Sequence, residues 1–188
     1  MAAESSFKNM TLCLTAVCLV CSALLGIVYS ATEGIIEKTA SEKLVSSISQ
    51  VLPDFDKLGD KKSVDVDGRS FDYYDAFDSA GNSCGVAVIS SATGFGGNLQ
   101  VLVGIDASGN IYNTEVLSHS ETPGLGAKCS GDFKEQFRGW NPSEKELSVK
   151  KDGGDVDAIT AATITSRAYI SAIESAVRVF IKYRDNCM

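Results

Sequence analysis

A long uncharged run near the amino terminus is the strongest pattern of hydrophobic positions in the sequence. Residues 9–32 contain no charged side chain, and residues 10–30 are rich in Leu, Val, Ala and Cys. A helix of about 20 apolar residues crosses the hydrocarbon core of a bilayer. We therefore predict a short tail over residues 1–9 and a transmembrane helix over residues 10–30. A signal peptide is the competing interpretation, but the run is long for one and no clear Ala-x-Ala cleavage site follows it.

The segment after this run has a weaker pattern. Ile35, Ile36 and Val45 give residues 31–53 a modest apolar face, which predicts a connecting helix. Pro53 ends that helix, because the residue before a proline avoids helical backbone angles. Residues 54–69 are polar and typical of turns.

Strand patterns dominate from residue 70 onward. Residues 71–74, 85–90 and 111–117 are rich in aromatic or β-branched side chains, and residues 98–106 alternate between apolar and polar. Turn residues at 79–82 and 106–110 separate these runs, and residues 132–137 favour a short helix. We therefore predict an α+β domain over residues 54–188, an antiparallel sheet flanked by helices and tethered by one N-terminal transmembrane helix.

The last predicted helix follows a cluster of hydroxyl side chains. Ile170, Ile173, Val177 and Phe180 have the spacing of a helix with one buried face. Residues 157–166, just before and at its start, read Asp-Ala-Ile-Thr-Ala-Ala-Thr-Ile-Thr-Ser. Hydroxyl groups there satisfy free backbone N–H groups, and the same N–H groups and the helix dipole also suit a phosphate. Both interpretations, a helix cap and a phosphate site, remain open on these residues alone.

Charge and composition exclude several classes of function. The formal net charge is −7, with the whole excess after the apolar run, so we expect no nucleic-acid partner, which would need clustered Lys and Arg. His119 is the only histidine, which excludes a multi-histidine metal site. There is no GxSxG or GxxxxGK[ST] segment, and the glycines around Phe95 precede a strand rather than a helix. Of six cysteines only Cys84, Cys129 and Cys187 lie outside the apolar run, an odd number that predicts no disulfide framework.

The string Asp-x-x-Thr-Ala-Ala-Thr at residues 157–163 resembles the flavinylation motif Asp-x-x-Ser/Thr-Gly-Ala-Thr/Ser. That motif belongs to the FMN-binding subunits of Rnf complexes and of sodium-translocating NADH:quinone reductases. The resemblance implies FMN bound covalently, through a phosphoester to Thr163. The chain departs from the motif at Ala161, where the family usually has Gly. An added methyl group restricts the backbone there if φ is positive.

A second string resembles the same family. Residues 119–128, His-Ser-Glu-Thr-Pro-Gly-Leu-Gly-Ala-Lys, match its His-x-Glu-Thr-Pro-Gly-Leu-Gly loop. The Pro-Gly pair indicates a turn, and Gly126 lets a ligand approach the backbone. Glu121 offers an acceptor, Leu125 an apolar contact to a ring, and Lys128 a cation for a phosphate. The resemblance also covers the apolar run, residues 51–53 and residues 94–106, and it is greatest to the G subunits of Rnf complexes.

The resemblance implies an electron-transfer subunit of an ion-translocating ferredoxin:NAD oxidoreductase, a translocase that relays electrons through FMN. The implied partners are the A, B, C, D and E subunits of the complex, membrane lipid, and a flavin transferase that loads FMN from FAD. The implied location is the inner membrane, with a single span and the FMN domain on the periplasmic side. Besides Thr163, the expected cofactor-binding residues are Glu121, Thr122, Leu125, Gly126, Lys128, Thr160, Ala161 and Ala162, with motif support from Asp157, His119 and Thr165.

Two alternative functions remain open from the sequence. The first is the equivalent FMN subunit of the sodium-translocating quinone reductase, which is usually longer than these 188 residues. The second is an anchored flavin-binding sensor or assembly module that transfers no electrons.

Overall fold

The computed structural model describes residues 7–187, so most of the predicted tail lies outside the described residues. Helix α1 (Phe7–Val51) is continuous through both the predicted span and the predicted connecting helix, and it ends just before Pro53 as expected. Its apolar part is long enough to cross a membrane, by length and composition. The predicted boundary after residue 53 stays a proposal. In the structure the compact unit begins earlier, at Leu44, because the last turns of α1 pack within it.

The compact unit contains a six-stranded antiparallel sheet, which confirms the predicted meander and the α+β class. Strands β3 (Arg69–Phe77), β4 (Ser83–Thr93), β5 (Asn98–Asp106) and β6 (Ile111–His119) follow one another in space as in sequence. Strands β1 (Lys57–Leu58) and β2 (Lys62–Val66) both pair with β3. Residues 54–69, which we expected to be polar and rich in turns, therefore also contain two strands that the sequence pattern did not indicate.

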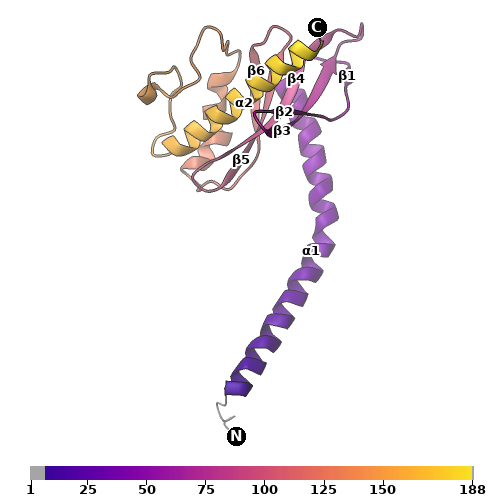
Figure 1. Cartoon of the computed structure of the whole chain (residues 1–188), viewed down its shortest axis with the longest axis vertical. Coiled ribbons are helices and arrows are strands. Elements are labelled where there is room, and N and C mark those ends of the chain that lie inside the picture. Colours follow the sequence, from indigo (N-terminus) through magenta and orange to yellow (C-terminus); the bar gives the residue numbers. More distant parts are fainter. Residues whose placement is uncertain (1–6, 188) are drawn as a thin grey trace. The chain divides into compact units, whose positions relative to one another are not determined.

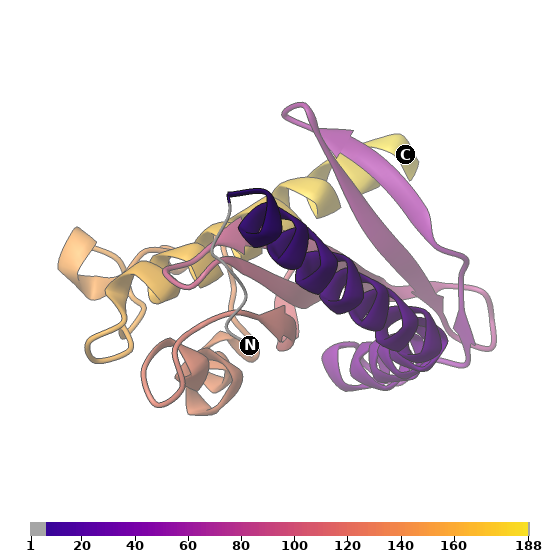
Figure 2. The ribbon, with the colours of Figure 1, turned by 90° about the horizontal axis from the view of Figure 1, so that it is seen from below.

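The turn between β2 and β3 explains why that segment forms a hairpin. Asp67 and Gly68 have φ values of 53° and 74°. Two consecutive positive φ angles are those of a type I′ turn, whose twist matches the twist of paired strands. Val64 and Val66 pack against the main core, so the short β2 strand has one apolar face. In Figure 2 this hairpin projects from the rest of the sheet at its turn.

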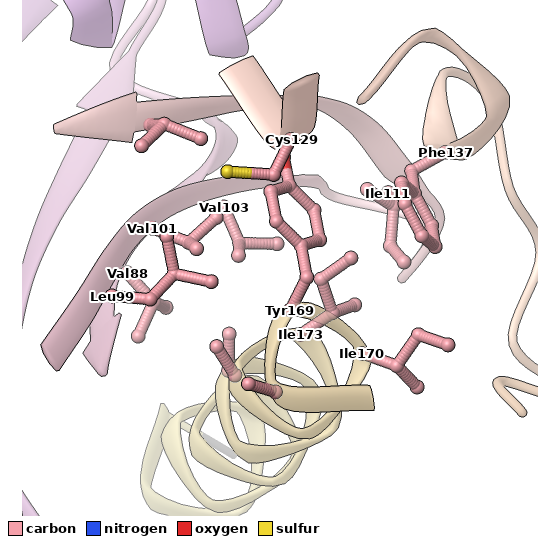
Figure 3. Close-up of a cluster of buried hydrophobic side chains, with 14 of the residues drawn as sticks. Val88, Leu99, Val101, Val103, Ile111, Cys129, Phe137, Tyr169, Ile170 and Ile173 are labelled. Carbon is pink, nitrogen blue, oxygen red and sulfur yellow. The ribbon is translucent and has the colours of Figure 1, made fainter. Parts of the chain in front are cut away.

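One face of the sheet is covered by helix α2 (Thr163–Cys187), which crosses it diagonally in Figure 1. The short 3-10 helices η1 (Gly126–Ser130) and η2 (Asp132–Phe137) lie against β6, and η3 (Lys150–Asp152) follows them in sequence. The helix predicted at residues 132–137 is thus present as η2. Figure 3 shows Tyr169 of α2 reaching from the helix toward Cys129, among the valines of β4 and β5.

The opposite face of the sheet packs against the carboxyl end of α1. Ile48, Val51 and Leu52 are buried there against Ala87 and Leu102. The approach is very close at Gly104 of β5, where a Cβ atom would lie 1.7 Å from the Val51 carbonyl oxygen. Only glycine fits at this point, so the sequence of β5 is adapted to the end of α1.

Candidate functional site

The segment before α2 is an ordered loop fastened by Ser166. The Ser166 hydroxyl accepts a hydrogen bond from the Ile159 N–H at 2.9 Å and donates one to the Ala162 carbonyl at 3.0 Å. Ala161 has a φ of 62°, in the left-handed region that disfavours side chains. The backbone at 161 is therefore in the conformation where the family's Gly has an advantage.

Thr163 is the first residue of α2 and is half-buried. The first hydrogen bond of the helix runs from the Ser166 N–H to the Ala162 carbonyl, at 3.0 Å. The N–H groups of residues 163–165 precede that bond and, in the first turn of a helix, have no partner within the helix. The start of α2 thus has the donors and the dipole end that favour an anion.

A buried carboxylate connects this helix start to the loop after β6. Glu121 is 5% exposed, and its Oε2 accepts a hydrogen bond from the Thr165 hydroxyl at 2.9 Å. Its Oε1 is buried and has no hydrogen-bond partner among the described residues. Two glycines make room for this carboxylate, since a Cβ at Gly94 would lie 2.0 Å from Oε1 and one at Gly126 would lie 2.4 Å from Oε2. The space at Gly126, which we had assigned to an approaching ligand, is taken by Glu121.

A pocket of about 370 Å³ opens at this junction, and we name it the acceptor pocket. Its walls come from the Glu121 loop, the segment before α2 and the first turn of α2. The lining residues are Phe95, Glu121, Thr122, Leu125, Gly126, Ala161, Ala162, Thr163, Ile164 and Thr165. The structure therefore brings most of the predicted site residues together, although the two strings are far apart in the sequence.

Two residues of the acceptor pocket were not anticipated. Phe95 is 73% exposed and Ile164 is 52% exposed, and both line the pocket together with the exposed Leu125. Large exposed apolar side chains around a pocket indicate a surface that binds an apolar group. The signal in the sequence was an aromatic residue isolated among glycines, in a segment that we used only to exclude a nucleotide-binding motif.

Three of the predicted residues lie elsewhere. Lys128, Asp157 and Thr160 line a separate hollow of about 820 Å³, together with Trp140 and other side chains. A fourth predicted residue, His119, lines neither hollow, and its Nδ1 accepts a hydrogen bond from the Glu121 N–H at 3.2 Å. His119 thus supports the loop rather than lining the acceptor pocket.

Asp157, the first residue of the motif, is held from η2 by Gln136. The Asp157 N–H donates to Gln136 Oε1 at 2.8 Å, and Gln136 Nε2 donates to the Asp157 carbonyl at 3.1 Å. This pair of bonds, which we call the Gln136 clasp, mimics one pairing of a β-ladder. Lys150 adds a salt bridge to the exposed Asp157 carboxylate at 2.8 Å. No sequence pattern pointed to Gln136, because its role depends on a contact across the fold.

Two titratable side chains, Tyr169 and Cys129, are buried in the core near the site. Burial raises the pKa of Tyr169, whose hydroxyl donates a hydrogen bond to the Thr114 hydroxyl at 2.8 Å. Burial likewise raises the pKa of the Cys129 thiol. Both groups remain neutral near pH 7, so they serve as packing rather than as nucleophiles. Over residues 7–187, no group of three His, Cys, Asp or Glu side chains is placed to hold a metal ion.

The acceptor pocket fits a flavin by its chemistry. It combines exposed apolar side chains, a buried carboxylate oxygen in need of a donor, and the anion-favouring start of α2. A flavin nucleotide has a flat apolar ring, N–H and O–H donors, and a phosphate. A pocket of 300–1,000 Å³, mostly apolar and with a few placed polar groups, is typical of cofactor sites.

Comparison with known proteins decides the family. The sequence model of a protein family, the FMN-binding domain, matches residues 94–178, which include both motif strings. The G subunit of the ion-translocating oxidoreductase complex from Shewanella baltica is 34% identical over 179 residues, covering 86% of this chain and 84% of the relative. The chain belongs to the family of G subunits of ion-translocating oxidoreductase complexes.

Other members of this family match equally broadly. The Methanosarcina acetivorans protein is 37% identical over 164 residues, covering 84% of this chain and 86% of the relative. Among solved structures, the C subunit of the sodium-translocating NADH-quinone reductase from Parabacteroides distasonis is 21% identical, with a TM-score of 0.49 over 76% of this chain and 83% of that one. The family predicted from the two motif strings is confirmed by the relatives.

Proposed function

We propose that this chain is the membrane-anchored flavoprotein subunit that relays electrons within an ion-translocating oxidoreductase complex, through FMN held covalently at Thr163. Relatives that match most of the chain are subunits of such a complex, and the matched domain is an FMN-binding domain. When bound, FMN supplies the one- or two-electron redox chemistry. The protein supplies its position, its electrostatic surroundings and its attachment.

The assignment to Thr163 rests on the exposure of the four hydroxyl residues around the start of α2, which are Thr160, Thr163, Thr165 and Ser166. Thr165 and Ser166 are at most 1% exposed, and both hydroxyls are engaged, with Glu121 and with the loop backbone. Thr160 is exposed but lines the other hollow. Thr163 alone among the four combines a place in the acceptor pocket with partial exposure at the start of α2.

The chemistry of attachment follows from this position. The Thr163 hydroxyl oxygen forms the new ester bond to the FMN phosphorus of FAD, the bond from that phosphorus to AMP breaks, and the hydroxyl proton is released. A flavin transferase catalyses this step. The N–H groups of residues 163–165 and the positive end of the α2 dipole would hold the phosphodiester once formed. Glu121 Oε1, which is buried without a partner among the described residues, would accept a hydrogen bond from a flavin N–H or ribityl O–H group.

Intact-mass analysis of the protein co-expressed with a flavin transferase tests the proposal. The wild-type chain should gain the mass of one FMN residue. Thr163→Val, which keeps the side-chain shape, should gain none, whereas Thr160→Val and Thr165→Val should retain the addition. A flavin that persists on Thr163→Val would refute the acceptor assignment. A wild-type chain without any flavin would refute the function.

The proposal places the FMN domain on the outer side of the inner membrane, with α1 as a single span and lipid around its apolar part. The other subunits of the complex are then its electron donors and acceptors. Lys57→Cys, on the exposed strand β1, tests this orientation. A membrane-impermeant maleimide should label it in intact cells stripped of any outer barrier. Labelling only after lysis would place the domain in the cytoplasm.

A further inference from the structure

The sheet opens at one end into a wedge between β3 and β4. These strands pair from Phe77 and Ser83 as far as Asp72 and Ile89, and no farther. Beyond that point residues 69–71 pair only with β2, and residues 90–93 pair only with β5. Each stretch therefore has one open edge facing the other across the wedge. Unpaired strand edges present rows of N–H and C=O groups that can pair with another chain.

The wedge is a real hollow of about 790 Å³ rather than a gap filled by side chains. Its two sides are residues 69–72 and 89–93, with Asn98 and Gln100 beside the latter. Its floor is the amino-terminal half of α2, at Ile164, Arg167, Ala168 and Ser171. Ser90 lines it, is 1% exposed, and has a hydroxyl with no hydrogen-bond partner among the described residues. A buried hydroxyl that lacks a partner indicates a missing donor or acceptor.

Most charged side chains around the wedge are paired with an opposite charge, but among the described residues Arg69 is not. Arg167 forms a bidentate salt bridge with Asp152, at 2.8 and 2.9 Å, and Asp72 forms one with Lys61 at 2.8 Å. Arg69 is exposed, and no hydrogen bond or ion pair joins its side chain to another residue described in the structure. In a chain with a net charge of −7, this is a local site for a negative group.

We propose that the wedge binds an extended segment of another protein subunit, which adds a strand to the open edge of β4 and places an acidic side chain against Arg69. Open backbone edges select an extended peptide, because its N–H and C=O groups match them in spacing. The acidic side chain fixes the register. The inference rests on the proposed function, since it supposes a multi-subunit complex.

The location gives the contact a functional meaning. Ile164 lines both the wedge and the acceptor pocket, so the two sites are separated by the first turn of α2. A partner strand in the wedge lies next to the residue that carries the flavin. Electron transfer depends on short distances, so a partner protein held here is well placed to exchange electrons with it.

A photo-crosslinking experiment in the membranes of the native host tests the contact. The photoreactive residue p-benzoylphenylalanine replaces Thr93, which is exposed on the open edge of β4. The control carries it at Ala80, which is exposed in the turn at the closed end of β3 and β4. We expect an adduct with another subunit at Thr93 and at least tenfold less at Ala80. Adducts only with lipid, only with a second copy of this chain, or equal at both positions would overturn the proposal.

Reversing the charge of Arg69 tests the contact in the wedge independently of flavin attachment. We expect Arg69→Glu to lower the amount of this chain that co-purifies with the complex by about tenfold, as expected for a lost interface ion pair. Arg69→Lys should retain most of it, and Lys57→Glu, a matched reversal on β1, should leave it unchanged. Intact mass should show the same FMN content in all three. Normal co-purification of Arg69→Glu would overturn the proposed contact, whereas absence of FMN from every protein would count against the proposed function instead.

Discussion

Ala161 is strained in this structure, and replacing it with glycine should stabilise the domain. Its φ of 62° costs a residue with a Cβ atom about 1–2 kcal/mol. Glycine removes that cost. Its greater conformational entropy in the unfolded chain, however, lowers the free energy of unfolding by about 0.4–1 kcal/mol. Ala161 is exposed, so no buried methyl group is lost. The net expectation for Ala161→Gly is a free energy of unfolding higher by about 0.5–1 kcal/mol, or a Tm higher by about 2–4 °C.

The neighbouring alanine provides the control for this prediction. Ala162 is buried, and its φ is not positive. Ala162→Gly should therefore lower the free energy of unfolding by about 1 kcal/mol, through the added entropy and the lost packing. Urea unfolding of the two variants, followed by circular dichroism, measures the difference. Equal destabilisation by both substitutions would mean that the backbone at residue 161 is not left-handed, and the reasoning would fail.

Three further substitutions test other parts of the structure. Gly104→Ala should destabilise the domain by about 3 kcal/mol or more, because its methyl group meets the Val51 carbonyl; a urea midpoint within error of wild type would contradict that close approach. Leu125→Ala should shift the flavin absorbance or its redox potential while intact mass shows the flavin still attached, and an unchanged spectrum and potential would exclude the contact. Hydrogen bonds from Lys61, and then from Ser63, lower the pKa of Asp72 below its ordinary 3.8, so its stabilisation exists above that pH and is lost as the pH falls through the lowered value. Asp72→Asn should therefore lower the urea midpoint fully at pH 7 and progressively less as the pH falls below 3.8, and a loss that stays the same down to the lowest pH at which the domain folds would argue against the ionic contribution.

Most of the fold followed from periodicity in the sequence. The alternation in residues 98–106 and the helical spacing of Ile170, Ile173 and Phe180 predicted β5 and α2, and all three of these side chains are buried. The β2–β3 hairpin was missed because its apolar signal consists of two valines among charged residues. The Asp67-Gly68 pair was the available sign, since that dipeptide favours type I′ turns.

The site was predictable in its segments but not in its geometry. The motif strings identified the Glu121 loop and the segment before α2 as walls of the acceptor pocket, yet only tertiary contacts show that Lys128 and Thr160 line a different hollow. Sequence position does not tell on which side of a loop a side chain lies. For the same reason Phe95 and Ile164 were missed, because their exposure becomes informative only beside a pocket.

If a flavin transferase modifies this chain, as the proposed function requires, the Gln136 clasp has a consequence for how that enzyme meets the acceptor loop. The Asp157 carboxylate is 72% exposed, while the backbone N–H and C=O of the same residue are both bonded to Gln136. The conformational freedom of the acceptor loop is therefore removed when the domain folds and not when an enzyme binds. The enzyme then binds a preorganised loop and pays little conformational entropy to order it. An unfolded or freshly synthesised chain lacks this order and should bind more weakly. Under the proposed function, flavin loading would therefore follow the completion of folding.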